Sequence, residues 1–308
     1  MSTTSEAAEA ETVADERCAS CGTAGGNDIK LKNCTACYLV KYCGVECQRN
    51  HRAEHKRECK RRAAELKDEL LFKQPESTHL GDCPICLLPI LPIDTPQSKT
   101  RLCTYHCCSN VVCNGCVRAN NLREIEARLS PTCPFCRHSL PRTDEEIFQL
   151  GMKRVEANDP FALCNVGTDH FERGDFTTAF KFWKKAAGLG NIQAHYLLSN
   201  VYDNGEGVEQ NMRKYEYHLE QAAIGGHVLA RHNLAALEDE RCNIERATKH
   251  LVIAANLGCD PSIKALKKYY SRGVISKEDF DSALRAYQVA LGASKSPQRD
   301  AAEALMAE

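Results

Sequence analysis

The sequence predicts a mostly α-helical fold in which two small cysteine-rich modules precede a solenoid of helical hairpins. Two observations carry this prediction. Sixteen of the nineteen cysteines lie between Cys18 and Cys136, and many are paired across two intervening residues. The second half of the chain holds only three cysteines and repeats itself with a period of about 34 residues, which is typical of stacked helical hairpins.

The composition fits a globular chain of about two domains of roughly 100 to 200 residues each. Its 308 residues carry 40 basic and 41 acidic side chains, a balance unlike that of a dedicated nucleic-acid-binding protein. No apolar run approaches the roughly 20 residues needed to cross a bilayer. Residues 1–16 are acidic without a basic residue, which predicts a disordered tail and no secretory or mitochondrial presequence. We expect an intracellular protein, cytoplasmic, nuclear or both, with no membrane association.

The cysteine pairs indicate a bound metal. Five pairs have the form C-x2-C: Cys18/Cys21, Cys34/Cys37, Cys83/Cys86, Cys113/Cys116 and Cys133/Cys136. Two intervening residues let a tight turn present both thiolates to one tetrahedral ion, as in structural zinc sites. Disulfides would require an oxidising compartment, toward which nothing directs the chain. Buried thiols that act as small hydrophobic groups explain the isolated Cys164, Cys242 and Cys259, but not five pairs.

The first module carries eight candidate zinc ligands, enough for two tetrahedral sites. The two pairs Cys18/Cys21 and Cys34/Cys37 are followed by Cys43-x3-Cys47 and His55-x3-Cys59. The stretch QRNHRAEHKRECKRRAAEL contains no Gly or Pro, so a helix is expected there. On that helix Cys47, His51, His55 and Cys59 share one face, because each is four residues from the next.

These residues, with CTACYLVKYCGVECQRNHRAEHKREC at their centre, resemble a MYND-type zinc finger over residues 17–60. The resemblance implies two interleaved zinc sites, one formed by Cys18, Cys21, Cys43 and Cys47 and the other by Cys34, Cys37, His55 and Cys59. It leaves His51 as a packing group beside the ligands. Fingers of this family bind short proline-containing peptides. Gln48 matches the usual Gln of their groove, whereas Arg52 stands where many of them carry Trp.

Basic residues are frequent on the same predicted helix, among them Arg49, Lys56, Arg57 and Lys60. Acidic residues interleave with them, and such a mixed face is usually solvated. We therefore expect protein partners, bound through a peptide motif or a helix, rather than nucleic acid. Residues 61–80 are expected to continue the helix as a linker.

The second module, residues 81–139, resembles a RING finger. CPIC at 83–86 and CPFCR at 133–137 bracket CCSNVVCNGC at 107–116. RING fingers are cross-braced two-zinc domains that dock ubiquitin-conjugating enzymes. The resemblance implies that Cys83, Cys86, Cys113 and Cys116 hold one ion and that Cys108, Cys133 and Cys136 contribute to another, so this module takes up to two zinc ions.

The fourth ligand of that second site departs from the family pattern. The position where RING fingers carry His is Asn110, and an amide is a poor zinc ligand. Cys107, His106 or Cys103 would have to complete the site, and we favour Cys107. The alternatives are a site that is open in its fourth position or a site that is absent.

Three further residues match RING positions that contact the conjugating enzyme: Ile85 and Pro134 as apolar contacts and Arg137 as a bridging cation. The competing interpretation is packing within tight turns for the first two and a solvated charge for the third. Between the halves, RANNLREIEARLS spaces Leu122, Ile125 and Leu129 as a short helix would.

Residues 158–295 are predicted to form about four helical hairpins. AAGLG, AAIGG, AANLG and VALG end on Gly190, Gly226, Gly258 and Gly292. The small pairs allow close helix approach, and the Gly is expected to cap a helix end. The stretch AHYLLSNVYDNGEGVEQNMRKYEYHLEQAAIGG resembles the SEL-one-like subclass of tetratricopeptide-like repeats, with its full loop at residues 202–208. Trp183 is expected in the core. Residues 140–157 are read as a linker and 296–308 as a polar tail.

The function expected from these modules is a zinc-binding protein-interaction scaffold or adaptor with no catalytic residues of its own. The alternative is a RING-type ubiquitin-protein ligase, in which the second module docks the conjugating enzyme and the repeats select the substrate. Such a ligase forms no covalent intermediate and works by orienting the reactants.

Overall fold

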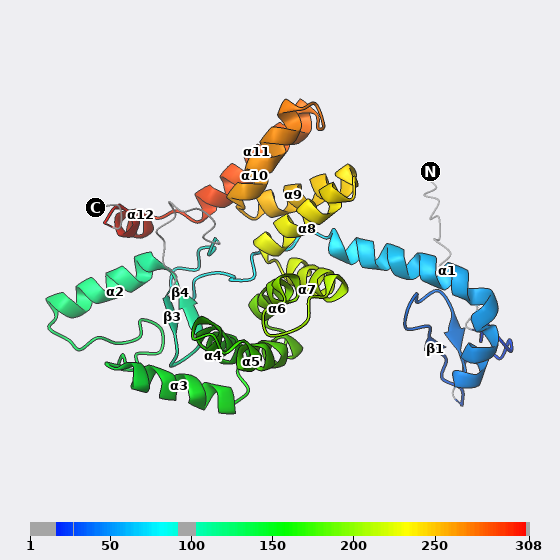
Figure 1. The fold of residues 1–308 in the computed structure, drawn as a ribbon, viewed down its shortest axis with the longest axis horizontal. Helices are drawn as coiled ribbons and strands as arrows, with labels where there is room; N and C mark the ends of the chain where they lie inside the picture. Colours follow the sequence, from blue (N-terminus) through cyan, green and yellow to red (C-terminus); the bar gives the residue numbers. More distant parts are fainter. Residues whose placement is uncertain (1–16, 27, 92–102, 306–308) are drawn as a thin grey trace, which may run out of the picture. The chain divides into compact units, whose positions relative to one another are not determined.

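The computed structural model describes residues 17–26, 28–91 and 103–305. The chain forms two compact units, Met1–Leu71 and Phe72–Glu308. Figure 1 labels the elements of each unit. The predicted acidic tail and much of the Pro-containing loop of the second module lie outside the described residues. The predicted fold class is confirmed: the described ranges contain twelve helices and two short hairpins of strands, with cysteine clusters in the two modules.

The first unit contains one small hairpin and one long helix. Strands β1 (Lys32–Asn33) and β2 (Lys41–Tyr42) pair antiparallel, with Lys32 opposite Tyr42. Helix α1 (Val45–Leu71) carries Cys47, His55 and Cys59 of the finger and continues well beyond them. The helical linker expected to residue 80 ends at Leu71, so the prediction is wrong for residues 72–80. Pro75 explains the difference, because proline has no N–H and disfavours helical backbone in the residue before it.

The second unit begins with the other cysteine-rich module. Strands β3 (Cys103–Tyr105) and β4 (Asn110–Val112) pair antiparallel, and helix α2 (Asn114–Glu126) follows directly. The helix expected from RANNLREIEARLS is thus present and begins earlier than that stretch. A small core of Ile90 and Val112 packs among the thiols of Cys83, Cys113 and Cys116.

Helix α3 (Asp144–Glu156) occupies the segment that was expected to be a linker. Thr143 caps it by accepting a hydrogen bond from the Glu146 N–H at 3.2 Å, and three acidic residues fill its first turn. Both features stabilise a helix N-terminus. Val155 packs into the core of the first hairpin, so α3 is part of the helical array.

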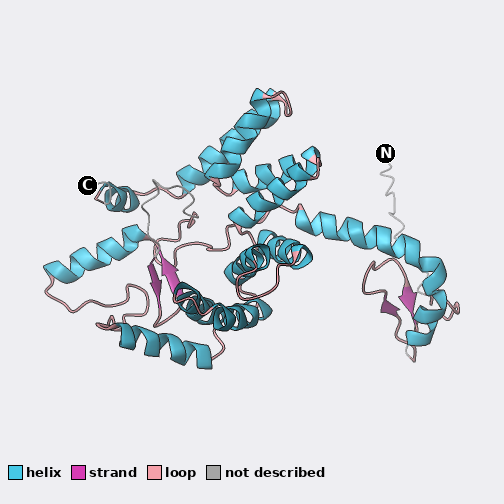
Figure 2. Ribbon diagram, viewed as in Figure 1, coloured by secondary structure: helices cyan, strands magenta, loops and turns pink. Residues whose placement is uncertain are grey.

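Four helical hairpins follow, as the period predicts (Figure 2). They are α4 (Pro160–Glu172) with α5 (Phe176–Gly188), α6 (Ile192–Asn204) with α7 (Met212–Ile224), α8 (Val228–Glu240) with α9 (Ile244–Asn256), and α10 (Asp260–Ser271) with α11 (Lys277–Ala293). The small alanine pairs of α5, α7 and α9 are buried, which allows the close helix approach that the sequence indicates.

The turns between hairpins use the predicted glycines, with one exception. Gly190, Gly226 and Gly258 follow α5, α7 and α9 with φ between 84° and 87°, the left-handed region that favours glycine. Gly292 instead lies inside α11, because this last helix runs on to Ala293. The expected core role holds for Trp183, which is 2% exposed and donates from Nε1 to the Cys164 carbonyl at 3.1 Å.

Two further segments differ from their expected roles. Cys242 was expected to fill core space, but it is exposed in the turn before α9, with a φ of 60°. Cys164 and Cys259 are buried as expected. Helix α12 (Pro297–Ala304) lies in the expected polar tail and packs against α2 (Figure 1).

None of the described helices combines the length and the apolar character that crossing a membrane requires.

Candidate metal centres

The described residues contain four groups of thiols and imidazoles that could each hold one metal ion. The members of each group offer ligand atoms that all lie within 4.8 Å of one another. The groups are Cys18, Cys21, Cys43 and Cys47; Cys34, Cys37, His55 and Cys59; Cys83, Cys86, Cys113 and Cys116; and Cys107, Cys108, Cys133 and Cys136. All sixteen residues singled out in the sequence are brought together, in the predicted combinations.

The ligand atoms have the spacing that zinc requires. A tetrahedral ion with Zn–S bonds of about 2.3 Å separates its sulfurs by about 3.8 Å. The Sγ–Sγ distances are 3.6 Å for Cys21 and Cys43, 3.7 Å for Cys34 and Cys59, and 3.8 Å for both Cys86 with Cys113 and Cys108 with Cys133. Thiolate and imidazole are also the donors that zinc prefers, so the residues present fit four zinc ions.

The groups alternate along the chain in both modules. In each module the first and third ligand segments form one group, and the second and fourth form the other. Each ion would therefore join distant parts of its module, which a short chain with a small core needs in order to hold a fixed shape.

Four of the C-x2-C pairs share one backbone turn. The residue after the second cysteine donates its N–H to the carbonyl of the first, at 2.8–2.9 Å, and has a φ between 56° and 75°. These residues are Gly22, Tyr38, Leu87 and Arg137. The turn directs further N–H groups at the thiols. In the pair of Cys113 and Cys116, the corresponding bond from the Val117 N–H, 3.1 Å long, starts α2 instead.

These N–H groups favour the thiolate, which is the form that binds zinc. Hydrogen bonds from the backbone of Cys21 and Cys43 lower the pKa of Cys18 from 9.0 to about 6. Burial raises the pKa of Cys83, but hydrogen bonds from the backbone of Cys86, Cys113 and Ile85 outweigh it and bring that pKa to about 7.

The imidazole of His55 belongs to the second group of the first finger. It is buried, and its Nε2 lies 3.1 Å from the Sγ of Cys37. His51, on the preceding turn of α1, stacks on it with ring centroids 5.7 Å apart. The Nδ1 of His51 pairs with the Tyr42 hydroxyl at 3.1 Å, so this second histidine packs beside the ligands without joining either group.

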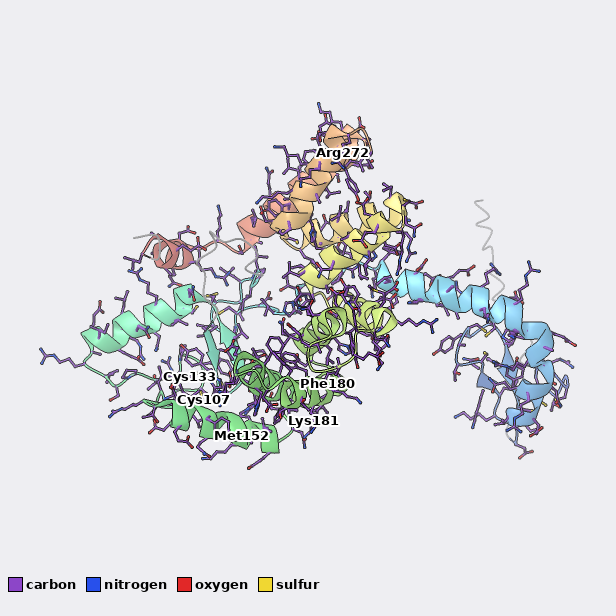
Figure 3. All side chains as sticks on the ribbon, viewed as in Figure 1. Cys107, Cys133, Met152, Phe180, Lys181 and Arg272 are labelled. Atoms are coloured by element: carbon purple, nitrogen blue, oxygen red, sulfur yellow. The ribbon has the colours of Figure 1, made fainter. Side chains whose placement is uncertain are left out.

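The fourth member of the last group is Cys107, the residue favoured from the sequence. Its Sγ lies 3.4 Å from that of Cys136, and Figure 3 labels it close to Cys133. His106 lies outside the group, and the side chain of Cys103 is not among the described ones. Asn110 donates from Nδ2 to the carbonyl of Cys108 at 3.2 Å, which braces the loop that presents both adjacent thiols.

The three candidate contacts for a conjugating enzyme differ in exposure. Ile85 is 41% exposed and Arg137 is exposed, whereas Pro134 is buried within its turn. The guanidinium of Arg137 donates from Nη1 to Oδ1 of Asn120 on α2 at 3.0 Å. Phe135, which the sequence analysis did not single out, is 45% exposed beside the buried proline.

A separate hollow lies on the helical array. Its volume is about 540 Å³, and its lining includes Lys184, His195, Tyr217, His218 and Gln221. The two histidines pair through their Nδ1 atoms at 3.0 Å, and burial lowers the pKa of His218 to about 4. No periodic pattern predicts this pairing, because the two histidines come from different helices.

The geometry defines a zinc-binding protein in which two fingers precede a helical-repeat array. Comparison with known proteins adds to this description. Residues 18–59 match the family model of the MYND finger. The mouse (Mus musculus) protein "DAP3-binding cell death enhancer 1" is 24% identical over 175 residues, which cover 44% of this chain and 34% of that protein. The chain thus spans about a third of the length of this relative.

Two solved structures are similar in part. A Sel1 repeat protein from Oxalobacter formigenes matches with a TM-score of 0.43 and 19% identity, over 58% of this chain and 72% of that one. A protective antigen of uropathogenic Escherichia coli strains, described as displaying an SLR fold, matches with a TM-score of 0.32 and 15% identity, over 62% and 51%. The described residues thus combine a MYND finger, four candidate zinc sites and an array of helical hairpins.

Proposed function

We propose that the first finger binds a short apolar peptide and that the helical array binds a second protein, so that the chain brings two partners together. The exposed apolar side chains of the finger carry this proposal. Tyr38 and Val45 are each 64% exposed and flank the hairpin and the start of α1, where Gln48 is also exposed. Exposed apolar side chains on a zinc-stabilised module favour a binding role.

Binding of proline-containing peptides to the zinc-loaded full chain tests this role. We expect Tyr38→Ser and Gln48→Ala to weaken binding about tenfold each, because a contact residue at a small interface contributes roughly 1–2 kcal/mol. Arg49→Ala is the matched control, since Arg49 is exposed on the same helix and pairs with Glu46 at 2.6 Å. Equal affinities for all variants, measured by fluorescence anisotropy, would place the peptide elsewhere, and a peptide panel without any binding would contradict the proposal.

In this proposal, residues 17–60, 81–139 and 158–295 act as the three functional modules. The array would contribute the hollow on α5, α6 and α7, where a lysine, a tyrosine and a histidine pair offer both charge and aromatic surface. Recognition there would use the side chains of several hairpins at once, as is usual for stacked helical repeats.

A second candidate function is that of a ubiquitin-protein ligase, and the exposed surface of the second finger favours it. Ile85 and Leu87 on the first metal-binding turn, Leu122 on α2 and Phe135 on the last turn are all exposed apolar residues. The cross-braced groups draw these segments together. They would form the shallow apolar surface to which a conjugating enzyme docks.

The chemistry of such a ligase would be positional. Arg137 would bridge the conjugating enzyme and ubiquitin, because a planar guanidinium can donate to several carbonyl groups at once. Its hydrogen bond to Asn120 fixes the side chain on one side and would limit the conformational freedom lost on binding. Acceleration would come from holding the thioester in a reactive orientation toward an acceptor lysine.

Autoubiquitination with a panel of conjugating enzymes tests this second function. We expect Ile85→Ala and Arg137→Ala to reduce ubiquitin transfer at least about tenfold, because each removes a contact to the charged enzyme. Gln48→Ala, on the other finger, should transfer ubiquitin at the wild-type rate. Silence of the wild-type chain across a broad panel would contradict the ligase function and leave the scaffold function intact.

A further inference from the structure

The C-terminal helix α12 reaches one of the metal groups. Arg299, on its first turn, donates from Nη2 to the Sγ of Cys86 at 3.4 Å. The same guanidinium donates to the carbonyls of Leu88 at 3.0 Å and Pro89 at 2.7 Å, just beyond that cysteine. A fourth bond, to the carbonyl of Ser294 at 2.7 Å, ties it to its own end of the chain. One side chain thus holds a thiol and the backbone of the turn that presents it.

The second finger is built to receive this helix. A Cβ on Gly115, at the start of α2, would lie 2.8 Å from the Arg299 backbone nitrogen, so only glycine permits the approach. Arg118, one turn along α2, donates from Nη1 to the carbonyl of Ala301 at 2.5 Å. Ala302 is buried. α12 therefore contacts α2 through its backbone at both Arg299 and Ala301.

The negative charge of the zinc-loaded group favours a contact with the Arg299 guanidinium. Four thiolates around one Zn²⁺ carry a net charge of −2, and a guanidinium at hydrogen-bond distance offsets half of it. A charge-assisted hydrogen bond to a metal ligand also holds that ligand in place, and such partners commonly alter metal affinity. The carbonyl contacts fix the orientation of the turn that carries Cys86.

We propose that Arg299 is a positioning residue for the zinc ion of Cys83, Cys86, Cys113 and Cys116, so that the end of the chain controls how firmly this ion is held. The contact works in both directions, because coupling between two equilibria is reciprocal. Zinc in this group favours the docked α12, and docked α12 strengthens zinc binding by the same factor. The inference requires a zinc ion in this group and is independent of peptide or conjugating-enzyme binding.

Zinc release from the full chain to a chromogenic chelator tests the proposal. In Arg299→Ala, one ion per chain should leave about ten to a hundred times faster than in the wild type, while the other three keep their rates. Hydrogen exchange in residues 83–90, followed in parallel, assigns the fast ion to this turn. Arg299→Lys keeps the positive charge but loses the several N–H donors of the guanidinium, so its rate of zinc release should be intermediate.

Arg118→Ala is the matched control, because it removes a bond between α2 and α12 without touching a thiol. It should release zinc at nearly the wild-type rate. An unchanged rate in Arg299→Ala, or an equal acceleration in both variants, would overturn the proposal. The wild-type chain supplies a second measurement: amides of α12 should exchange faster once zinc is removed, and unchanged exchange would overturn it as well.

Discussion

Removal of zinc should unfold both fingers and leave most of the helical array folded. We expect four zinc ions per chain by elemental analysis, and loss of amide protection over residues 18–59 and 81–139 when a strong chelator is added. The buried core of the first finger consists of Cys18, Cys34, Cys37 and Tyr42, so three of its four members are candidate ligands. Structural zinc supplies about 10 kcal/mol or more per ion, which this core cannot replace.

The helical array should stay folded when zinc is removed, because its core consists of apolar side chains that bind no metal. Helices α4 to α9 pack through buried alanine, leucine and valine side chains that belong to none of the four groups. Trp183, the one tryptophan of the sequence, lies in this core and reports on it by fluorescence. Its emission should persist in chelator. Helix α12 is the expected exception, because the surface that receives it belongs to the second finger.

Paired cysteine variants separate metal binding from packing. Cys37 and Cys164 are both buried, and Cys164 lies outside the metal groups. Cys37→Ala should lose at least one zinc ion per chain and amide protection in the first finger, whereas Cys164→Ala should retain all four ions. A native chain with about two zinc ions would contradict the assignment of the second finger. Collapse of Trp183 fluorescence in chelator would contradict the independence of the array.

Substitution of Gly226 should destabilise the second unit more than substitution of Gly190 or Gly258, the glycines that follow α5 and α9. A Cβ on Gly226 would lie 2.6 Å from the Ser77 carbonyl oxygen and 3.2 Å from the His79 nitrogen. Here the segment that precedes the second finger crosses the turn after α7, and the His79 N–H donates to the Gly226 carbonyl at 3.1 Å. Because the clash is with backbone, Gly226→Ala should cost about 4 kcal/mol, of which about 1 reflects its positive φ.

Gly190→Ala is the matched control. Gly190 occupies the same place in the preceding repeat, with a φ of 87°, but a Cβ there meets nothing within 4 Å. It should therefore cost only the backbone strain, about 1 kcal/mol. Thermal unfolding followed by Trp183 fluorescence should place Gly226→Ala about 8 °C below Gly190→Ala. Equal midpoints would show that residues 77–79 are not packed on this turn in solution.

The stacked rings beside Gly226 explain why the segment cannot easily move aside. His79 stacks on His227, with ring centroids 4.2 Å apart, and Tyr196 stacks on the other side of His227 at the same distance. Burial lowers the pKa of His79 to about 4, so it stays neutral in this stack at neutral pH. Displacing the segment would expose these rings to water.

The metal groups could be predicted from the sequence because their signal is local. The spacing of thiols such as Cys83 and Cys86 follows from the geometry of one tetrahedral ion, and the turn that joins them has one backbone shape. The helical hairpins were predictable for a similar reason, since each repeat reuses the same small pairs and turn glycines. In both cases the structure is determined by residues that lie close together in the sequence.

The features that could not be predicted depend on contacts that leave no periodic pattern in the sequence. Three of the four bonds of Arg299 go to two backbone carbonyls and one thiol about 210 residues away, and any polar tail could carry such an arginine. Helix α3 carries local signals in Thr143 and its acidic first turn, although residues 140–157 were expected to be a linker. The burial of Pro134 and the exposure of Cys242 depend on how a turn faces its neighbours, which spacing alone does not specify.

The shared turn of the C-x2-C pairs leaves one position open to variation. To the turn itself, the residue after the second cysteine contributes its N–H and its positive φ, and glycine, tyrosine, leucine and arginine all occur there. Tyr38, Leu87 and Arg137 are all exposed. The side chain at this position can therefore change without altering the metal-binding residues. Substitutions there would give the fingers new binding specificities while their folds stay constant.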